Sequence, residues 1–107
     1  MISLQGDQGR WLLLFRDGGE DAGLAYAKID HDEHKGWGYI LEFYVVPAKR
    51  RRGLGRALYH HLASLLHAAG VDQIWLTSNE EAEPFWISLD FAKTGEVARN
   101  GLPILIN

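Results

Sequence analysis

With 107 residues, of which 47% are hydrophobic and 23% charged, the chain is long enough for one globular domain with a modest core and too short for two. Its formal net charge of -3 at pH 7 excludes a broadly basic surface for nucleic acid, so any basic site must be local. The absence of cysteine excludes disulfides, thiolate nucleophiles and cysteine-based zinc sites.

The first half of the chain predicts β-strands. Residues 11–16 (WLLLFR) predict a buried strand, and a turn rich in glycine and aspartate separates them from residues 23–30, in which side chains alternate with a period of two. We expect these two segments to pair as an antiparallel hairpin. Residues 39–46 (YILEFYVV) predict a longer apolar strand that ends at Pro47, and residues 1–5 have room for one short strand.

The hydrophobic period changes in the second half of the chain. Leucines recur at intervals of three and four between residues 51 and 69, which predicts a helix of about five turns ending at Gly70. Residues 74–78 predict a short strand, and residues 80–91 predict a second helix whose first turn is acidic. The tail predicts two short strands around an Asn-Gly turn.

These elements predict a mixed α/β fold. Their order is β-β-β-α-β-α-β-β, in a single domain that spans residues 1–107. The strand, helix and strand in the middle form a βαβ unit, so its two strands should lie parallel at the centre of the sheet. The outer strands, which tight turns connect, should be antiparallel.

A basic, glycine-rich stretch links the 39–46 strand to the first helix. It consists of Arg50, Arg51, Arg52, Gly53, Leu54, Gly55 and Arg56. The first amides of a helix have no partner and carry partial positive charge, and glycine lets a pyrophosphate approach them closely. Arginines at a helix start oppose the helix dipole unless an anion binds there. We therefore favour phosphate binding over a solvated charge run or a nucleic-acid patch.

Two familiar phosphate loops do not fit this stretch. A Walker loop needs lysine and a hydroxyl residue after its second glycine, where the chain has Arg56 and Ala57. The dinucleotide-binding pattern G-x-G-x-x-G needs glycine where Leu58 stands. The spacing that remains is V-x-P-x-x-R-x-x-G-x-G-x-x-L, which begins at Val45.

This spacing resembles the acyl-CoA-binding motif of the GNAT superfamily of N-acetyltransferases. A second stretch is similar to another signature of that family, and it comprises Asn79, Ala82, Trp86, Asp90 and Phe91. The resemblance spans about residues 11–106. It implies a chain that binds acetyl-CoA, whose pantetheine arm lies along the 39–46 strand and whose pyrophosphate lies on the amides of the basic loop.

The resemblance also assigns roles to single residues. It implies that Asn79 hydrogen-bonds the pantetheine arm, although the same side chain is also a candidate N-cap for the second helix. Trp86 either lines the acyl pocket or fills the core. The backbone N–H of Val45 is the expected donor to the oxyanion, and direct attack of an amine on the thioester is the expected reaction.

Proton transfer has two candidates on the 39–46 strand. Glu42 is the only charged residue of that strand, and burial there would raise its pKa and suit it as the base, unless it faces solvent. The family's tyrosine acid falls at Trp86, whose indole is not a usable acid. Three alternatives follow: Tyr44 or water protonates the thiolate, the thiolate leaves unassisted, or the chain binds acyl-CoA without efficient turnover.

Two functions therefore remain. The first is an N-acetyltransferase that uses acetyl-CoA and an unknown primary amine, and the second is a non-catalytic acyl-CoA sensor or interaction module on the same fold. Typical family members carry further helices that wall the acceptor site ahead of the first hairpin, and only ten residues precede Trp11. An open groove for a peptide amine, completion of the wall by a partner, or loss of acceptor chemistry would follow. An exposed sheet edge favours a homodimer.

Other classes of site are not expected. The histidines lack the grouping of a metal site, so we expect acetyl-CoA as cosubstrate and no metal. No apolar run approaches the roughly 18 residues of a membrane span, and the N-terminus lacks the pattern of a signal peptide. We therefore expect a cytoplasmic protein with no membrane or nucleic-acid partner.

Overall fold

The computed structural model describes residues 2–7, 9–50 and 52–107, with residues 2–7 described by their backbone alone. These residues form a seven-stranded sheet in the order β1-β2-β3-β4-β5-β7-β6. The elements are β1 (Ile2–Asp7), β2 (Arg10–Asp17), β3 (Glu20–Ile29), β4 (Gly38–Val45), η1 (Pro47–Lys49), α1 (Leu54–Ala68), β5 (Ile74–Thr77), α2 (Glu83–Ser88), β6 (Ala92–Val97) and β7 (Pro103–Ile106).

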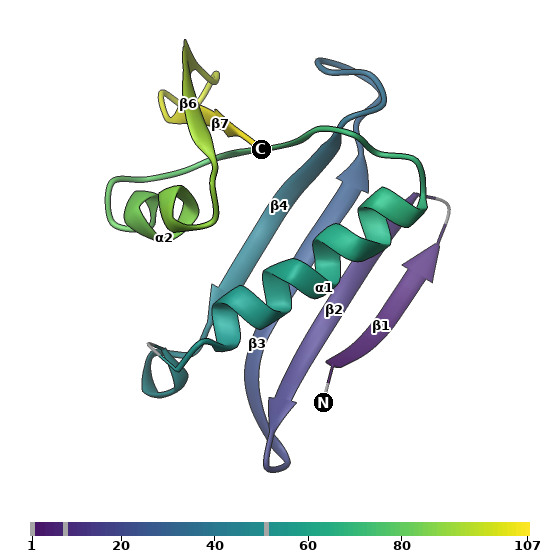
Figure 1. Cartoon of the computed structure of the whole chain (residues 1–107), viewed down its shortest axis with the longest axis vertical. Coiled ribbons are helices and arrows are strands. Elements are labelled where there is room, and N and C mark those ends of the chain that lie inside the picture. The colour runs from purple at the N-terminus through teal and green to yellow at the C-terminus, as the bar shows by residue number, and fades with distance from the viewer. Residues whose placement is uncertain (1, 8, 51) are drawn as a thin grey trace.

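The predicted mixed α/β fold is confirmed. Its elements follow in the expected order, with β1 ahead of them where the sequence left room for one short strand. All neighbouring strands are antiparallel except β4 and β5, which form the expected parallel pair joined through α1. Figure 1 shows α1 crossing one face of β2, β3 and β4.

Both helices begin a few residues later than predicted, at Leu54 in place of residue 51 and at Glu83 in place of residue 80. Each difference has a local cause. Gly53 has a φ of 77°, a left-handed conformation that places it ahead of the first helical residue of α1. The Asn79 side chain accepts a hydrogen bond from the Ala82 N–H at 2.8 Å, which forms a turn before α2. α2 is followed by Asp90, whose φ of 69° is the left-handed conformation common after a helix.

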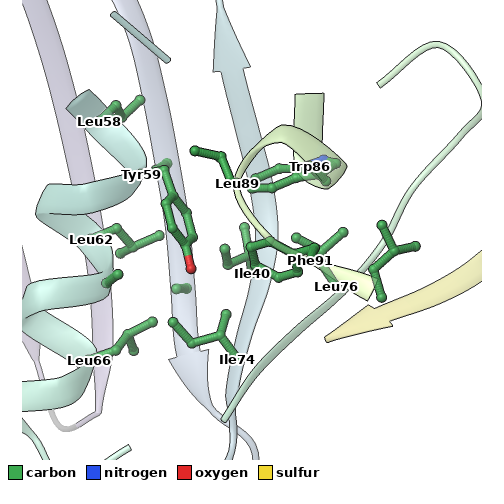
Figure 2. Packing of buried hydrophobic residues seen from close by; sticks show 14 of the residues in the cluster. Ile40, Leu58, Tyr59, Leu62, Leu66, Ile74, Leu76, Trp86, Leu89 and Phe91 are labelled. Carbon is green, nitrogen blue, oxygen red and sulfur yellow. The ribbon is translucent and has the colours of Figure 1, made fainter. Parts of the chain in front are cut away.

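The core lies between α1 and the sheet. Leu58, Leu62 and Leu66 recur every four residues on α1, and each is at most 1% exposed. They form the apolar stripe that the sequence predicts, and burial of each side chain contributes about 1.5–3 kcal/mol. Ala25 and Ala27 of β3 belong to the same cluster, and their small side chains leave room for the helix. Figure 2 shows the leucines of α1 beside Tyr59, Ile40 and Ile74.

An aromatic group extends this core from α1 to α2. Trp86 makes edge contacts with Phe43 and Phe91, at ring-centroid distances of 5.0 and 5.2 Å. Tyr59 contacts Phe91 at 5.5 Å, and burial raises the pKa of its hydroxyl to about 12. Figure 2 shows Tyr59, Trp86 and Phe91 in one cluster. These contacts place α2 beside β4.

The opposite face of β2, β3 and β4 is different, because no helix of the described residues covers it. Its strands carry three large side chains that are more than one third exposed, Leu14 at 37%, Leu41 at 37% and Tyr44 at 44%. We call this surface the open sheet face. Within the described residues, no helix combines the length and the apolar composition needed to cross a lipid bilayer.

Candidate functional site

A groove lies where β4 and β5 separate. The two strands pair in register only at Gly38–Ile74 and Tyr39–Trp75, at the start of both strands. On the other side of β4, Ile40 pairs with Ala27 and Glu42 pairs with Tyr26, so Leu41 is the extra residue of a β-bulge. A bulge bends its strand locally, and this one lies just beyond the last pair that β4 makes with β5.

The groove has a volume of about 360 Å³. Its described lining comes from β4, from β5 and the loop after it, from α2 and from the final turn. These residues are Ile40, Leu41, Glu42, Phe43, Leu76, Thr77, Ser78, Asn79, Ala82, Trp86 and Leu102. The groove brings together three predicted site residues, Glu42, Asn79 and Trp86.

Glu42 lines the groove. Its side chain is exposed, so of the two alternatives that the sequence left open, burial or a position facing solvent, the structure shows the second. The cause is the bulge, because Ile40 and Phe43 both pack with the core while Leu41 and Glu42 between them are exposed. Glu42 is therefore an accessible carboxylate at the rim of the groove. An amine in solution can reach it.

Tyr44 and Val45 lie outside the groove lining as far as the described residues show. The Arg50 guanidinium lies over the Tyr44 ring at 5.5 Å from its centroid, a cation–π contact. Arg50 also donates from Nε to the Val45 carbonyl at 2.8 Å. Tyr44 and Val45 thus both contact Arg50, which lies just after the end of β4.

Among the described residues, the first amides of α1 make no hydrogen bond, as phosphate binding requires. The first amide to make a helical hydrogen bond is that of Ala57, which donates to the Gly53 carbonyl at 3.1 Å. No described side chain caps this end of the helix. The N–H groups of Leu54, Gly55 and Arg56 therefore lie at an uncapped helix start, where partial positive charge is concentrated.

The two glycines of the loop have different roles. Gly53 needs its left-handed φ of 77°, and a Cβ built on it would meet no atom within 4 Å. A Cβ on Gly55 would lie 3.0 and 3.2 Å from two ring carbons of Phe85, in α2. Gly55 therefore lets α2 pack on the start of α1, a role that the sequence analysis did not assign to it.

The arginines of the loop are less free than predicted. Arg52 donates from Nη1 to Asp17 Oδ2 at 3.3 Å, and Arg56 donates from Nη2 to the Ser88 carbonyl at 3.1 Å. Arg50 bonds the Val45 carbonyl, and Arg51 lies outside the described residues. Of these contacts, the Arg52 ion pair is the one that a competing anion can exchange most readily, because it is long and half-exposed.

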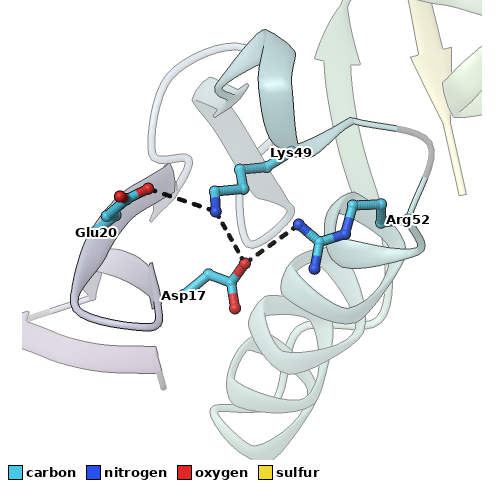
Figure 3. Close-up of polar contacts among 4 residues, drawn as sticks. All are labelled: Asp17, Glu20, Lys49 and Arg52. Carbon is cyan, nitrogen blue, oxygen red and sulfur yellow. Dashed lines mark hydrogen bonds and ion pairs between the residues drawn. The ribbon is translucent and has the colours of Figure 1, made fainter.

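Two acidic residues that the sequence analysis did not single out hold this loop. Figure 3 shows Lys49 between Asp17 and Glu20, with its Nζ 3.2 Å from Asp17 Oδ2 and 3.5 Å from Glu20 Oε2. Arg52 contacts the same Asp17 oxygen. Lys49, followed by Arg52, holds the pKa of Asp17 below its ordinary value. The turn between β2 and β3 is thereby tied to the loop before α1.

Asn79 and Trp86 each have a structural role and also border the groove. Asn79 caps the turn before α2 through its Oδ1, and its exposed side chain also lines the groove. Trp86 is 6% exposed and belongs to the core, while part of its surface borders the groove. Within the described part of the chain, no three or more His, Asp or Glu side chains are grouped to hold a metal ion.

Comparison with known families agrees with this geometry. The model of the acetyltransferase (GNAT) family matches residues 3–91, which is most of the chain. The chain belongs to the GNAT family. In this GNAT chain, the matched region contains most of the groove lining, the start of α1 and all of α2. No curated protein sequence matches the chain significantly.

Solved acetyltransferase structures share this fold at low sequence identity. The PaiA N-acetyltransferase of Thermoplasma acidophilum, solved with coenzyme A, is 16% identical with a TM-score of 0.79, over 92% of this chain and 60% of that one. An acetyltransferase of Thermus thermophilus is 22% identical with a TM-score of 0.79, over 94% and 65%. An aminoglycoside 6′-N-acetyltransferase, solved with coenzyme A, is 14% identical with a TM-score of 0.73, over 94% and 72%. The chain thus spans less than two thirds of the first two proteins.

Proposed function

We propose that residues 1–107 act as one acyl-CoA-binding domain that transfers an acetyl group from acetyl-CoA to a primary amine. The observation that carries this proposal is the position of Glu42, an accessible carboxylate on the rim of the groove between β4 and β5. Two of the structural neighbours were solved with coenzyme A, which supports coenzyme A as the ligand.

The residues around the groove fit such a donor. The uncapped amides of Leu54, Gly55 and Arg56 suit the pyrophosphate, and Arg52 is placed to exchange Asp17 for a phosphate oxygen. Phe85 connects this loop to the groove, because it contacts Gly55 and lies 5.6 Å from the Phe43 ring. Asn79, in the groove lining, supplies hydrogen bonds to the pantetheine arm.

The chemistry assigned to the chain is direct transfer. The amine nitrogen attacks the thioester carbonyl carbon, the carbon–sulfur bond breaks, and the proton of the amine passes to Glu42 directly or through water. The N–H of Val45 is the proposed donor to the oxyanion. Because the Tyr44 ring lies against the Arg50 guanidinium and the Trp86 indole is not an acid, we assign protonation of the thiolate to water, with Tyr44 as the alternative.

The test combines binding with turnover. Calorimetry with CoASH measures binding, and release of free thiol from acetyl-CoA measures transfer to polyamines, aminoglycosides, amino acids and peptides. We expect binding of CoASH and thiol release with at least one class of amine. Absence of CoASH binding would overturn the proposal as a whole.

A substitution tests the base. Glu42→Gln should lower kcat about 100-fold at pH 7, the lower range for general base catalysis, and should leave CoASH binding unchanged. Glu96→Gln is the matched control, because Glu96 is an exposed glutamate on β6, outside the described groove lining. Equal kcat values for wild type and Glu42→Gln would remove Glu42 from the mechanism.

A second function has an observation of its own. Trp86 occupies the position of the family's tyrosine acid and is packed against Phe43, so the groove lacks a hydroxyl there. This favours a non-catalytic acyl-CoA sensor or interaction module. CoASH binding without thiol release across all four classes of amine would support this function in place of the first.

We also propose that the chain forms a homodimer and acts in the cytoplasm. β1 and β6 are the two edges of the described sheet, and every residue of β6 is exposed. An unpaired edge of this length favours pairing with a second copy. Sedimentation of the purified chain tests this directly, and a monomer at micromolar concentration would contradict it.

A further inference from the structure

A second hollow lies on the other side of β3 from the groove. It has a volume of about 160 Å³ and is lined by Gly9, Arg10, Lys28, Ile29, His31 and Asp32. Arg10 and Lys28 are directly opposite each other on β2 and β3. Asp32 also lines the hollow and Lys28 interacts electrostatically with Asp30, so the two cations are partly balanced. Like charges directly opposite each other still destabilise a sheet, which favours a further anion between them.

Arg10 and Lys28 lie on the open sheet face, the same face as Glu42. Trp11, Ala27 and Ile29 pack with the core on the α1 side, so their neighbours Arg10 and Lys28 lie on the opposite side. No helix of the described residues covers this face. A ligand that reaches Glu42 from this side therefore also has access to Arg10 and Lys28.

A hydrogen bond directs Arg10 toward the Glu42 end of this face. Arg10 pairs with Lys28 across the strands, yet its Nη1 donates to the hydroxyl of Tyr26 at 2.8 Å. Tyr26 is two residues before Lys28 on β3 and is the cross-strand partner of Glu42. The guanidinium thus extends diagonally from its own position toward the residue that faces Glu42.

The distance between Glu42 and Lys28 indicates the length of a ligand that could contact both. Glu42 and Lys28 are diagonal neighbours on adjacent strands, which places the two residues about 7–8 Å apart, with their Cβ atoms somewhat closer. An extended dipeptide spans about 7 Å, since each residue covers about 3.3–3.6 Å. An amine beside Glu42 and a carboxylate beside Lys28 and Arg10 are therefore the two ends of one short peptide.

We propose that the hollow at Arg10 and Lys28 binds the carboxylate of the acceptor, and that the acceptor is a short peptide whose terminal amine lies at Glu42. This inference rests on the proposed transfer reaction for the role of Glu42. It goes further by naming the substrate class. Bidentate pairing with Arg10 and a point charge from Lys28 supply the recognition.

Two matched peptides test the inference. Gly-Gly carries a terminal carboxylate, and glycylglycinamide is the same molecule with a neutral amide in its place. With saturating acetyl-CoA, we expect kcat/KM for Gly-Gly to exceed that for the amide about three- to ten-fold at low salt, since the ion pairs are partly exposed. Equal values for the two peptides would overturn the inference.

Variants show whether the preference comes from this hollow. Arg10→Gln and Lys28→Gln should each reduce the preference, and together they should abolish it. Arg16→Gln is the control, because Arg16 is an exposed arginine on the same strand, outside the described lining of the hollow. A preference that survives the double variant, or is lost equally in Arg16→Gln, would overturn the inference.

Binding separates this inference from the proposed function. The same peptides are titrated against the 15N-labelled chain in the presence of CoASH, and shifts of the Arg10 and Lys28 amides are followed. If no peptide is acetylated, tighter binding of Gly-Gly that Arg10→Gln and Lys28→Gln remove still supports the carboxylate site. Failure of transfer then contradicts only the proposed acetyltransferase activity. Equal binding of both peptides contradicts the proposed carboxylate site at Arg10 and Lys28.

Discussion

At the residue scale, the most buried carboxylate of the described chain is outside the groove. Asp30 is 3% exposed and follows β3. Its two oxygens accept hydrogen bonds from the N–H groups of Asp32 and His34, at 3.0 and 2.8 Å. Burial opposes its charge, but these backbone donors outweigh that effect and hold the pKa of Asp30 below its ordinary value. Asp30 therefore fixes the loop between β3 and β4.

This arrangement predicts a pH-dependent loss of stability. Asp30→Ala should lower the free energy of unfolding by about 1–2 kcal/mol at pH 7, because two backbone amides lose a charged acceptor. A lowered folded pKa means that the contribution is present above the ordinary carboxyl pKa and is lost as pH falls through the folded value. Urea unfolding at pH 7 and below about pH 4 checks this. A difference between wild type and variant that stays constant with pH would contradict it.

Asp17 holds the basic loop before α1 through its ion pairs. It shares one oxygen between Lys49 and Arg52, and Lys49 keeps Glu20 as a second partner. Asp17→Asn frees Arg52 while Lys49 stays paired, so CoASH should bind about two- to five-fold more tightly at low salt. Calorimetry at two salt concentrations measures this, with Asp21→Asn of the same turn as control. Weaker CoASH binding by Asp17→Asn would show that Asp17 is needed to position the loop.

At the scale of elements, the contact between α1 and α2 depends on the absence of a side chain at Gly55. A methyl group on Gly55 would meet the Phe85 ring at 3.0 Å, closer than side chains normally pack. Gly55→Ala should therefore cost about 1–3 kcal/mol of stability and displace α2 from the groove. Phe85→Leu in the same chain should recover part of that loss, which a double-mutant cycle on thermal or urea unfolding measures. Additive effects of the two substitutions would mean that the contact does not form.

The elements themselves were largely predictable from the sequence, and the site was only partly so. The leucine period of α1 and the alternation of β3 are local patterns, and the structure confirms both. The bulge at Leu41 has no such local pattern, because it depends on how β4 pairs with β3. That pairing decides that Glu42 is exposed. Asp17 was not predicted for a similar reason, since its partner Arg52 is 35 residues away.

At the scale of the molecule, the sheet consists of two parts that few backbone contacts join. β1 to β4 form one antiparallel part and β5 to β7 the other, and β4 and β5 share two register pairs. At this junction, a Cβ on Gly38 would lie 3.1 Å from Leu66 and 3.2 Å from Val71, so helix and sheet are in close contact there. Beyond Tyr39 the two strands diverge around the groove. A ligand bound there would lie between β4 and β5, where the strands do not pair.

Ligand binding should therefore protect both walls of the groove together. A ligand at about 100 times its dissociation constant stabilises the folded state by about 2.7 kcal/mol, and that gain is shared by every element that unfolds with the site. Sub-global opening between β4 and β5 should be suppressed further, because ligand contacts both. In hydrogen exchange with and without CoASH, we expect added protection at residues 40–43 and 76–79 beyond that of β2. Protection confined to α1, or spread equally over all strands, would show that the two parts of the sheet do not separate at the groove.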